Sequence, residues 1–242
     1  MRKLTVAAAS SLFLAVPLAQ ADVIGLGAAI SYWDSDLSGR IVNNGDAVSV
    51  DNDLDLSSSS NTNATLYFEH PIPVLPNVRI NYTKVDQSGR GRVGAGGFDG
   101  VTGNVHSDLE IEQLDLTLYY EILDNWVNLD LGLTARDLSS ELTVSQVGGA
   151  LSSKTEVDGV VPMGYIAARF DLPFTGVSVG GAGNVISFDG DSLRDFNVYG
   201  QFEFALIQLR AGYRQMSLDY EDDDNTLDVD IDGPFISAGI SF

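Results

Sequence analysis

The sequence lacks cysteine altogether and contains only two histidines, His70 and His106. The absence of cysteine excludes disulfide bonds, covalent haem attachment and thiol chemistry. His70 precedes Pro71 in an expected turn, and His106 is followed directly by Ser107 and Asp108. Because three consecutive side chains diverge, they do not form a nucleophile, base and orienting acid. We therefore predict no catalytic residue and no cofactor.

Basic residues are scarce. The chain has 13 Lys and Arg against 34 Asp and Glu, which gives a formal net charge of −21. A polyanion would be repelled by such a chain, so the composition excludes nucleic acid as a partner. An acidic surface suits divalent cations, but it selects no particular ligand.

Long apolar runs are missing beyond the first 21 residues. Arg2 and Lys3 precede the uncharged stretch 4–18, and Ala19-Gln20-Ala21 supplies the small residues of a cleavage site. This pattern predicts a cleaved secretory signal peptide at 1–21, followed by one mature domain at 22–242. The uncharged stretch is shorter than the roughly 20 residues that a membrane-spanning helix needs. The longest later stretch without a charge, residues 172–188, is also shorter than that, and it is interrupted by glycines.

What recurs instead is an alternation of apolar and polar residues in segments of about ten residues. Leu129, Leu131 and Leu133, for example, fall on one face of a strand, and Asp130 and Thr134 fall on the other. The alternation predicts an all-β chain, folded as a single transmembrane antiparallel up-and-down β-barrel of about ten strands, with eight or twelve as alternatives. The expected strands are 23–33, 61–69, 78–83, 113–121, 127–136, 164–170, 177–188, 196–204, 207–214 and 234–242.

The gaps between these segments alternate in length. Outer-membrane barrels have long external loops and short periplasmic turns, whereas a soluble β-sandwich gives no reason for such alternation. We therefore expect both termini on the periplasmic side. The gaps expected as outer loops are 34–60, 86–108, 138–159, a shorter 189–192, and 221–230. The gaps expected as periplasmic turns are 70–77, 123–126, 171–176 and 205–206.

The last nine residues, 234–242, have one apolar and one small polar face and end in Phe242. This stretch resembles the final strand of bacterial outer-membrane barrels, and the resemblance implies that the barrel-assembly machinery reads Phe242 as an assembly signal. The segments 68–79 and 212–216 and the acidic run after Tyr220 resemble an uncharacterised family of small Gram-negative outer-membrane β-barrel proteins. That resemblance implies the fold and a location in the cell outer membrane, and it carries over no catalytic or binding residue.

The faces opposite the lipid-facing residues carry charges that would share a narrow lumen. Arginine suits such a place because its planar guanidinium satisfies carboxylates with two hydrogen bonds. We therefore predict a lumen charge network that packs the interior, although the same residues could also line a narrow ion-selective path. The predicted members are Arg79, Arg136, Arg169, Arg210, Arg214, Glu69, Asp115, Glu121, Asp130 and Glu203, with Tyr67, Tyr119, Tyr165 and Tyr199 beside them.

Asp228, Asp230 and Asp232 precede Gly233 and imitate the start of a calcium-binding loop. The residue that should supply a bidentate glutamate is Gly239, so the helix-loop-helix version fails. A solvated acidic edge is the simpler interpretation, and weak divalent binding is the functional one. The three carboxylates share the outward parity of the last strand, so either they rise above the bilayer or a bulge near Gly233 switches the phase.

The sequence therefore predicts a non-enzymatic outer-membrane barrel with acidic extracellular loops, a plugged lumen, and a structural or surface-interaction role. Its expected partners are outer-membrane lipid, lipopolysaccharide and the assembly machinery. A narrow channel for small solutes or ions is the first alternative. An outer-membrane hydrolase that uses His106 is the second.

Overall fold

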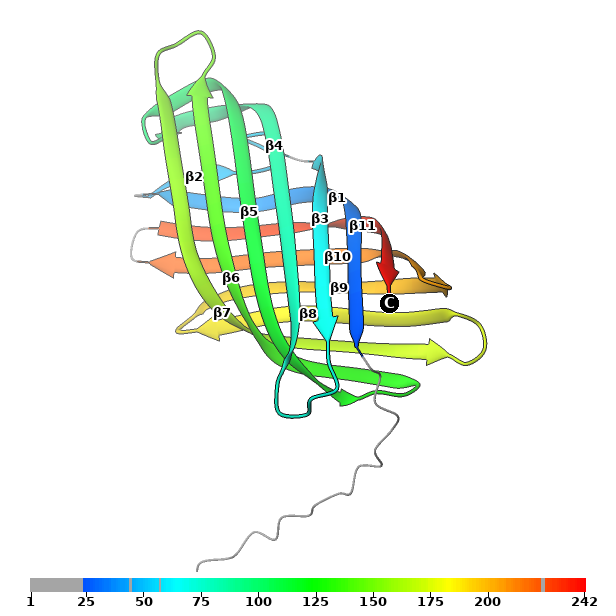
Figure 1. Cartoon of the computed structure of the whole chain (residues 1–242). Coiled ribbons are helices and arrows are strands. Elements are labelled where there is room, and N and C mark those ends of the chain that lie inside the picture. Colours follow the sequence, from blue (N-terminus) through cyan, green and yellow to red (C-terminus); the bar gives the residue numbers. More distant parts are fainter. Residues whose placement is uncertain (1–23, 44, 57, 223–224) are drawn as a thin grey trace, which may run out of the picture.

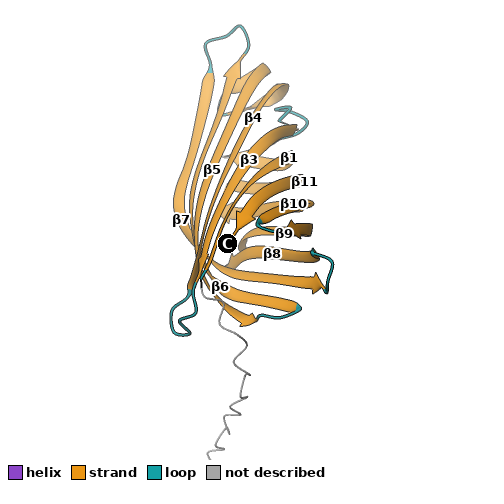
Figure 2. Cartoon of the chain, turned by 45° about the vertical axis from the view of Figure 1, so that its right-hand side comes forward, coloured by secondary structure: helices purple, strands orange, loops and turns teal. Residues whose placement is uncertain are grey.

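A computed structural model describes residues 24–43, 45–56, 58–222 and 225–242. The expected signal peptide at 1–21 lies outside the described residues. In the described part of the chain, no helix has the length and apolar character needed to cross a membrane. Figure 2 shows strands and loops throughout this part.

The strands follow the chain in order, and Figure 1 shows them wrapping around a common axis. Their bounds are β1 (Gly25–Asn43), β2 (Asp46–Ser49), β3 (Ser58–Glu69), β4 (Asn77–Phe98), β5 (Val101–Leu123), β6 (Val127–Gln146), β7 (Ser152–Leu172), β8 (Val177–Phe188), β9 (Asp191–Phe204), β10 (Ile207–Asp222) and β11 (Asn225–Ser241).

Every barrel strand pairs antiparallel with its neighbours in sequence, and β11 pairs back with β1 to close the ring. The short β2 pairs with the end of β1 and stands outside the ring, which leaves ten barrel strands among the described residues. Closure removes the unpaired edges that an open sheet would present. The predicted fold class, an up-and-down barrel of about ten strands, is confirmed.

A belt of large apolar side chains surrounds the outside of the barrel. Each of the ten barrel strands contributes to it, and Ile30, Leu133 and Val198 are 66%, 72% and 63% exposed. A continuous apolar surface of this kind is unfavourable in water and favourable in lipid. We call it the apolar belt, and its representatives from β1 and then β3 to β11 are Ile30, Leu66, Ile80, Leu116, Leu133, Ile166, Val179, Val198, Leu209 and Ile236.

The expectation of long outer loops is wrong for most of their length. The gap expected at 86–108 is strand except for the turn Asp99-Gly100, and the gap at 138–159 is strand except for residues 147–151. Asp99 and Gly100 have φ of 50° and 80°. Two successive positive φ values characterise the tight hairpin turn that Asp-Gly favours. The strands β4 to β7 therefore continue well beyond the apolar belt (Figure 1).

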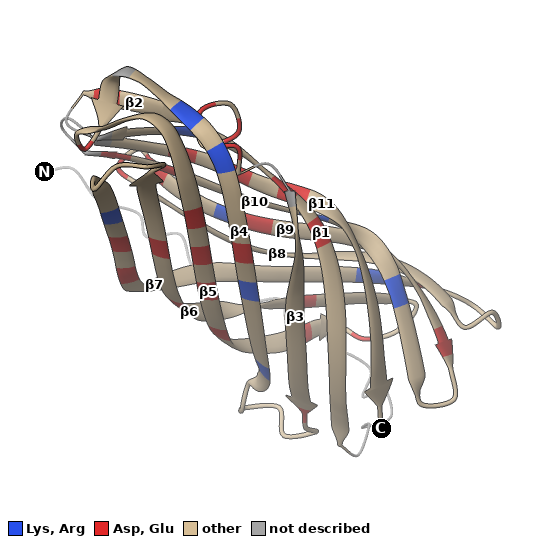
Figure 3. Ribbon diagram, turned by 90° about the horizontal axis from the view of Figure 1, so that it is seen from above, with Lys and Arg blue, Asp and Glu red and all other residues tan. Residues whose placement is uncertain are grey.

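The reason for this difference is that the amphipathic pattern inverts along the strands. Up to Tyr82 the outward positions of β4 are apolar, whereas the next outward residue is Lys84. From that level the inward positions become apolar, and Val85 and Val93 are 0% and 2% exposed. Outside the bilayer the exterior faces water, so the apolar side must turn inward. Figure 3 shows charged positions along β4 to β7.

The barrel is thus filled by an apolar interior at the end that carries the long hairpins, which we call the hairpin end. The connection between β1 and β3 contributes to it, because Val48, Leu54 and Leu56 are all buried. Gly89 and Gly91 on the inward face of β4 make room for this connection. A Cβ at either glycine would collide with the backbone of residues 53–55. Further buried members are Leu37, Val50, Val85, Val93, Val105, Ile111, Leu142 and Val144.

The strand register also settles the phase of β11. Pro234, Gly233 and Asp232 pair in unbroken order with Tyr213, Arg214 and Gln215 of β10. The chain therefore contains no phase-switching bulge at this point. Of the two alternatives, the structure supports the first: the three carboxylates, Asp228, Asp230 and Asp232, stand on the outer face beyond the apolar belt.

Candidate functional site: the lumen

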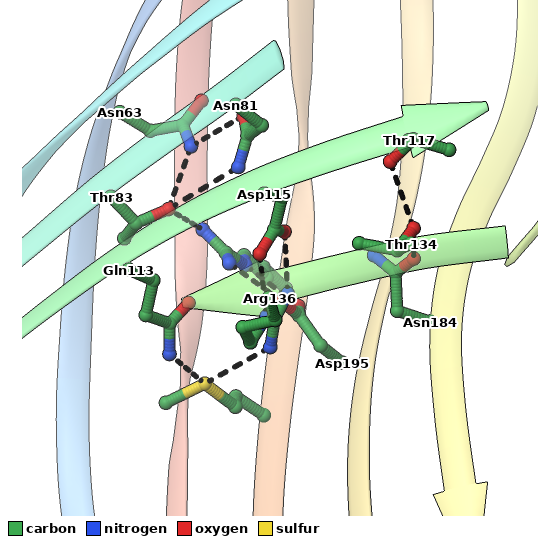
Figure 4. Close-up of polar contacts among 12 residues, drawn as sticks. Asn63, Asn81, Thr83, Gln113, Asp115, Thr117, Thr134, Arg136, Asn184 and Asp195 are labelled. Carbon is green, nitrogen blue, oxygen red and sulfur yellow. Dashed lines mark hydrogen bonds and ion pairs between the residues drawn. The ribbon is translucent and has the colours of Figure 1, made fainter. Parts of the chain in front are cut away.

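The lumen below the apolar interior holds four buried charged residues, which we call the ion cluster: Asp115, Arg136, Asp195 and Arg214. Arg136 is 0% exposed and donates to Asp115 Oδ1 through Nε at 2.7 Å and to Asp195 Oδ2 through a terminal nitrogen at 2.6 Å. Arg214 donates to both oxygens of Asp195, at 2.9 and 2.8 Å. Figure 4 shows the side chains of Asp115, Arg136 and Asp195 converging.

The ion cluster connects opposite walls of the barrel. Asp115 and Arg136 are cross-strand neighbours on β5 and β6, while Asp195 and Arg214 come from β9 and β10. In the ring of ten strands, β5 and β10 lie five places apart, which makes them directly opposite. Two guanidinium groups and two carboxylates balance in charge, and shared hydrogen bonds offset the cost of removing them from water.

Neighbouring side chains hold the ion cluster in place. The guanidinium carbon of Arg214 lies 4.7 Å from the centre of the Trp33 ring, and Arg214 also donates to Thr83 Oγ1 at 3.2 Å. Gln113 and Met216, from the opposed strands β5 and β10, contact each other beside Arg136. The cluster is therefore packed against polar, aromatic and thioether groups on the side of the apolar interior.

Between the ion cluster and the short turns lies a cavity of about 780 Å³. Asp195 and Arg214 border it at one end. At the other end it is lined by residues of three short turns, His70, Asp124 and Ala205. We call this the turn-end cavity. By the general rule for outer-membrane barrels, the end with short turns faces the periplasm.

The predicted lumen network is divided between these two places. The structure brings Asp115, Arg136 and Arg214 together in the ion cluster and distributes the other seven around the turn-end cavity. In the described part of the chain, no ion pair joins any two of those seven residues. The seven cavity residues are Arg79, Arg169, Arg210, Glu69, Glu121, Asp130 and Glu203.

The arginines of the cavity are held mainly by neutral partners. Arg79 donates to Tyr165 Oη at 3.2 Å, and Arg210 donates to Gln201 Oε1 at 2.6 Å. Arg210 also lies over the Tyr199 ring, 4.6 Å from its centre. Two carboxylates of the cavity, Glu69 and Glu121, are likewise hydrogen-bonded to neutral side chains.

Among the carboxylates, Glu69 accepts from Tyr119 Oη at 2.7 Å, and Glu121 accepts from Asn77 Nδ2 at 3.2 Å. Among the arginines, Arg169 is the one with a charged partner, because its Nε lies 3.0 Å from Asp171. Asp171 was not among the predicted residues.

Asp195 is the central residue that the sequence reasoning missed. The sequence contains the signal, because Phe196 and Val198 alternate with polar residues as lipid-facing positions, and position 195 therefore faces inward. The expected strand, however, begins at residue 196 and so does not include position 195. The strand begins five residues earlier, at Asp191.

The three carboxylates considered for divalent binding are not gathered into one site. They alternate along β11, where Asp228 faces Arg40 and Asp230 faces Ser38 on β1. Asp230 and Asp232 accept hydrogen bonds from Ser217 and Tyr213. Across the described ranges, no group of three or more His, Cys, Asp or Glu is arranged to hold a metal ion.

Beyond the apolar belt, several ion pairs lie on the outer surface. Lys84 lies 2.6 Å from Glu110, 3.2 Å from Glu112 and 3.6 Å from Asp86. Hydrogen bonds to the two glutamates raise the pKa of the Lys84 ammonium and lower that of Glu112. These exposed pairs contribute little to stability. They do mark the level at which the outward surface becomes hydrophilic.

His106 lies in this hydrophilic part, with its Nδ1 2.9 Å from Gly89 O and its Nε2 3.4 Å from Asp108. The neighbouring Ser107 is 0% exposed and belongs to the opposite face of β5. The two side chains therefore diverge, and the histidine cannot take a proton from that hydroxyl.

No family model matches the chain, and no curated protein matches it. Three solved structures resemble it in fold. The attachment invasion locus protein Ail of Yersinia pestis is 12% identical, with a TM-score of 0.39, over 91% of this chain and 99% of that one. Neisserial surface protein A is 12% identical, with a TM-score of 0.34, over 93% and 100%. The translocator domain of autotransporter NalP from Neisseria meningitidis is 10% identical, with a TM-score of 0.48, over 90% and 88%.

These neighbours are outer-membrane β-barrels of Gram-negative bacteria. The chain is a closed antiparallel β-barrel with an apolar outer belt. Its closed ring and its apolar belt are the features of its own structure that place it in a membrane. The likenesses concern architecture alone, so no activity or partner of those proteins is transferred to this one.

Proposed function

We propose that the protein is a non-conducting outer-membrane barrel whose role lies in envelope integrity or in contacts of its acidic outer surface. The observation that carries the proposal is the burial of Arg136, which is 0% exposed while it connects groups from opposed walls. A water-filled pore would leave such a side chain hydrated. The apolar interior above it supports the same conclusion, because a dry apolar section opposes the passage of ions.

The outer surface supports a role in contacts at the cell exterior. Acidic side chains of β4, β5 and β11 stand outward just beyond the apolar belt, at the level where lipid head groups begin. We infer that they approach lipopolysaccharide phosphates through shared divalent cations, since direct contact between the two anions would be repulsive. The carboxylates involved are Asp86, Glu110, Glu112, Asp228, Asp230 and Asp232.

Conductance in planar lipid bilayers tests the closed lumen, with Arg136→Ala as the informative variant. We expect the wild type to be nearly silent and Arg136→Ala to unfold more easily and to conduct. The replacement leaves two carboxylates against one arginine and opens space beside Asp115. Arg92→Ala is the matched control, because Arg92 is exposed on the outer part of β4. Steady conductance by the wild type, with no loss of stability in Arg136→Ala, would reject the proposal and favour a narrow channel.

A further inference from the structure

The turn-end cavity contains three arginines whose charges are not matched by carboxylates of the lumen network. Arg79 and Arg169 are near enough for their like charges to act on Arg210. Within the described ranges, Arg79 and Arg210 make no ion pair, and each has one hydrogen bond, to a neutral side chain. A guanidinium carries five N–H donors. Several donors therefore remain free to bind an anionic group in the cavity.

The same cavity contains four carboxylates of that network, and three of them, Glu69, Glu121 and Asp130, have the opposite need. Glu121 and Asp130 are direct cross-strand partners on β5 and β6, and both line the cavity. Like charges directly opposite each other in a sheet are destabilising. The charge of Glu69 acts on both of them. No lysine or arginine forms an ion pair with these three residues in the part of the chain that the structure describes.

The unpaired charges of the cavity come from several strands, and two of them face each other across it. Glu121 comes from β5, whereas Arg210 comes from β10, which is directly opposite in the ring of ten strands. A fold that needed only to fill its lumen would pair these groups, as it does in the ion cluster. Here Glu121 and Arg210 remain apart across the cavity, whereas Arg79 on β4 and Arg169 on β7 stand on strands next to those of the carboxylates. A ligand with two charged ends would satisfy both walls at once.

We infer that the turn-end cavity binds a small zwitterion, a molecule that carries an ammonium and a carboxylate. The carboxylate would accept hydrogen bonds from Arg210 and Arg79, and the ammonium would donate to Glu121 and Asp130. The volume of about 780 Å³ lies within the range of small-molecule sites and suits a compound between an amino acid and a short peptide. Tyr119 and Tyr199 offer aromatic surface beside the charged groups.

This inference goes beyond the proposed function and does not depend on it. Binding at the turn end requires only that the cavity be accessible from the periplasm. Conductance reports instead on the opposite half of the barrel. A conducting wild type would therefore reject the closed lumen and leave the binding site untouched.

Isothermal titration of the full mature protein in lipid nanodiscs tests the inference with three probes. Trialanine carries both charges, N-acetyltrialanine lacks the ammonium, and trialanine amide lacks the carboxylate. We expect trialanine to bind at least about tenfold more tightly than either capped form, because each cap leaves one wall unsatisfied. Absence of trialanine binding would overturn the inference. Equal binding of all three probes would overturn it as well, since the charged walls would then play no part.

Two variants connect binding to the named residues. Glu121→Gln should weaken trialanine binding by about tenfold. It should not lower the melting temperature, because it removes a repulsion with Asp130. Arg210→Gln should weaken binding similarly, and should spare the weak binding of trialanine amide. The controls Glu156→Gln and Arg92→Gln change exposed residues outside the cavity and should leave binding unchanged.

A fall in melting temperature for Glu121→Gln, with binding intact, would show that the carboxylate serves the fold. That result would reject the inference. Because this variant is expected to fold at least as well as the wild type, the test remains decisive even if Arg210→Gln proves unstable.

Discussion

At the scale of single residues, the contrast between Asp195 and Glu121 shows two uses of buried or enclosed charge. Asp195 is 4% exposed and accepts three hydrogen bonds from two arginines. Its charge is therefore fully compensated by the protein itself. Glu121 faces the carboxylate of Asp130 on the next strand and accepts a hydrogen bond from the Asn77 amide. The first arrangement stabilises a closed interior, and the second favours an incoming cation.

Asp195→Ala should reduce the free energy of unfolding by about 3–5 kcal/mol, because it leaves two buried arginines with Asp115 alone. Urea titration of the protein in phospholipid vesicles measures this effect. Asp158→Ala changes an exposed carboxylate on β7 and should stay within about 0.5 kcal/mol of the wild type. Equal effects of the two substitutions would contradict the assigned role of the ion cluster.

The candidate site could be predicted from the sequence to the extent that inward parity could be counted. Alternation alone assigns Arg79, Arg136, Asp115 and Arg210 to the lumen. It cannot say how far along the axis each side chain reaches. Strand tilt and stagger decide that, and they depend on the register of all ten strands together. This is why one expected network is divided between the ion cluster and the turn-end cavity.

At the scale of elements, the inversion of the amphipathic pattern explains what sequence reading missed. The segments within the apolar belt were recognised because their outward residues are apolar. Sequence reading predicts a loop where β4 continues, although Val85 and Val93 keep the alternation in the opposite phase. Asp99-Gly100 also marks a tight turn. To predict the full length of β4 from the sequence, one must allow its surroundings to change from lipid to water partway along the strand.

Gly91 tests the packing of the β1–β3 connection inside β4. Gly91→Ala should lower the free energy of unfolding by about 1–3 kcal/mol, because its Cβ would collide with the Asp53 backbone. It should also increase proteolysis within residues 45–56, which limited digestion of the folded protein would detect. Gly94→Ala is the matched control on the same strand, since a Cβ there meets nothing within 4 Å. A tolerated Gly91→Ala would show that the connection is free to move away.

At the scale of the whole molecule, the ring is closed by the pairing of β11 with β1. Leu26 and Phe242 exchange two backbone hydrogen bonds, of 3.2 and 2.9 Å, at the end of this seam. The Phe242 side chain is 64% exposed, so it adds little packing to the folded barrel. Its expected role as an assembly signal is thus separable from its contribution to the finished structure.

Phe242→Ala retains the backbone hydrogen bonds and removes only the aromatic ring. We expect the variant to refold into detergent micelles about as well as the wild type, and to accumulate less in the outer membrane of cells. Quantitative immunoblotting of membrane fractions, set beside the refolding yield, measures both. Phe204→Ala is the control, because Phe204 is another exposed aromatic residue near the short turns, 71% exposed. Normal accumulation of Phe242→Ala would argue against the signal.

The change of solvent along β4 also sets the vertical position of the molecule. Between Tyr82 and Lys84 the outer wall passes from lipid to water, and a strand rises about 3.4 Å per residue. Moving that boundary by one inward–outward repeat shifts it by about 7 Å along the strand, which for strands tilted by about 40° raises or lowers the barrel by about 5 Å. The bilayer would have to stretch or thin to follow. Tyr82 and Lys84 thus mark the boundary between the lipid-facing and the solvent-facing surface, and this boundary fixes how much of the protein stands above the bilayer.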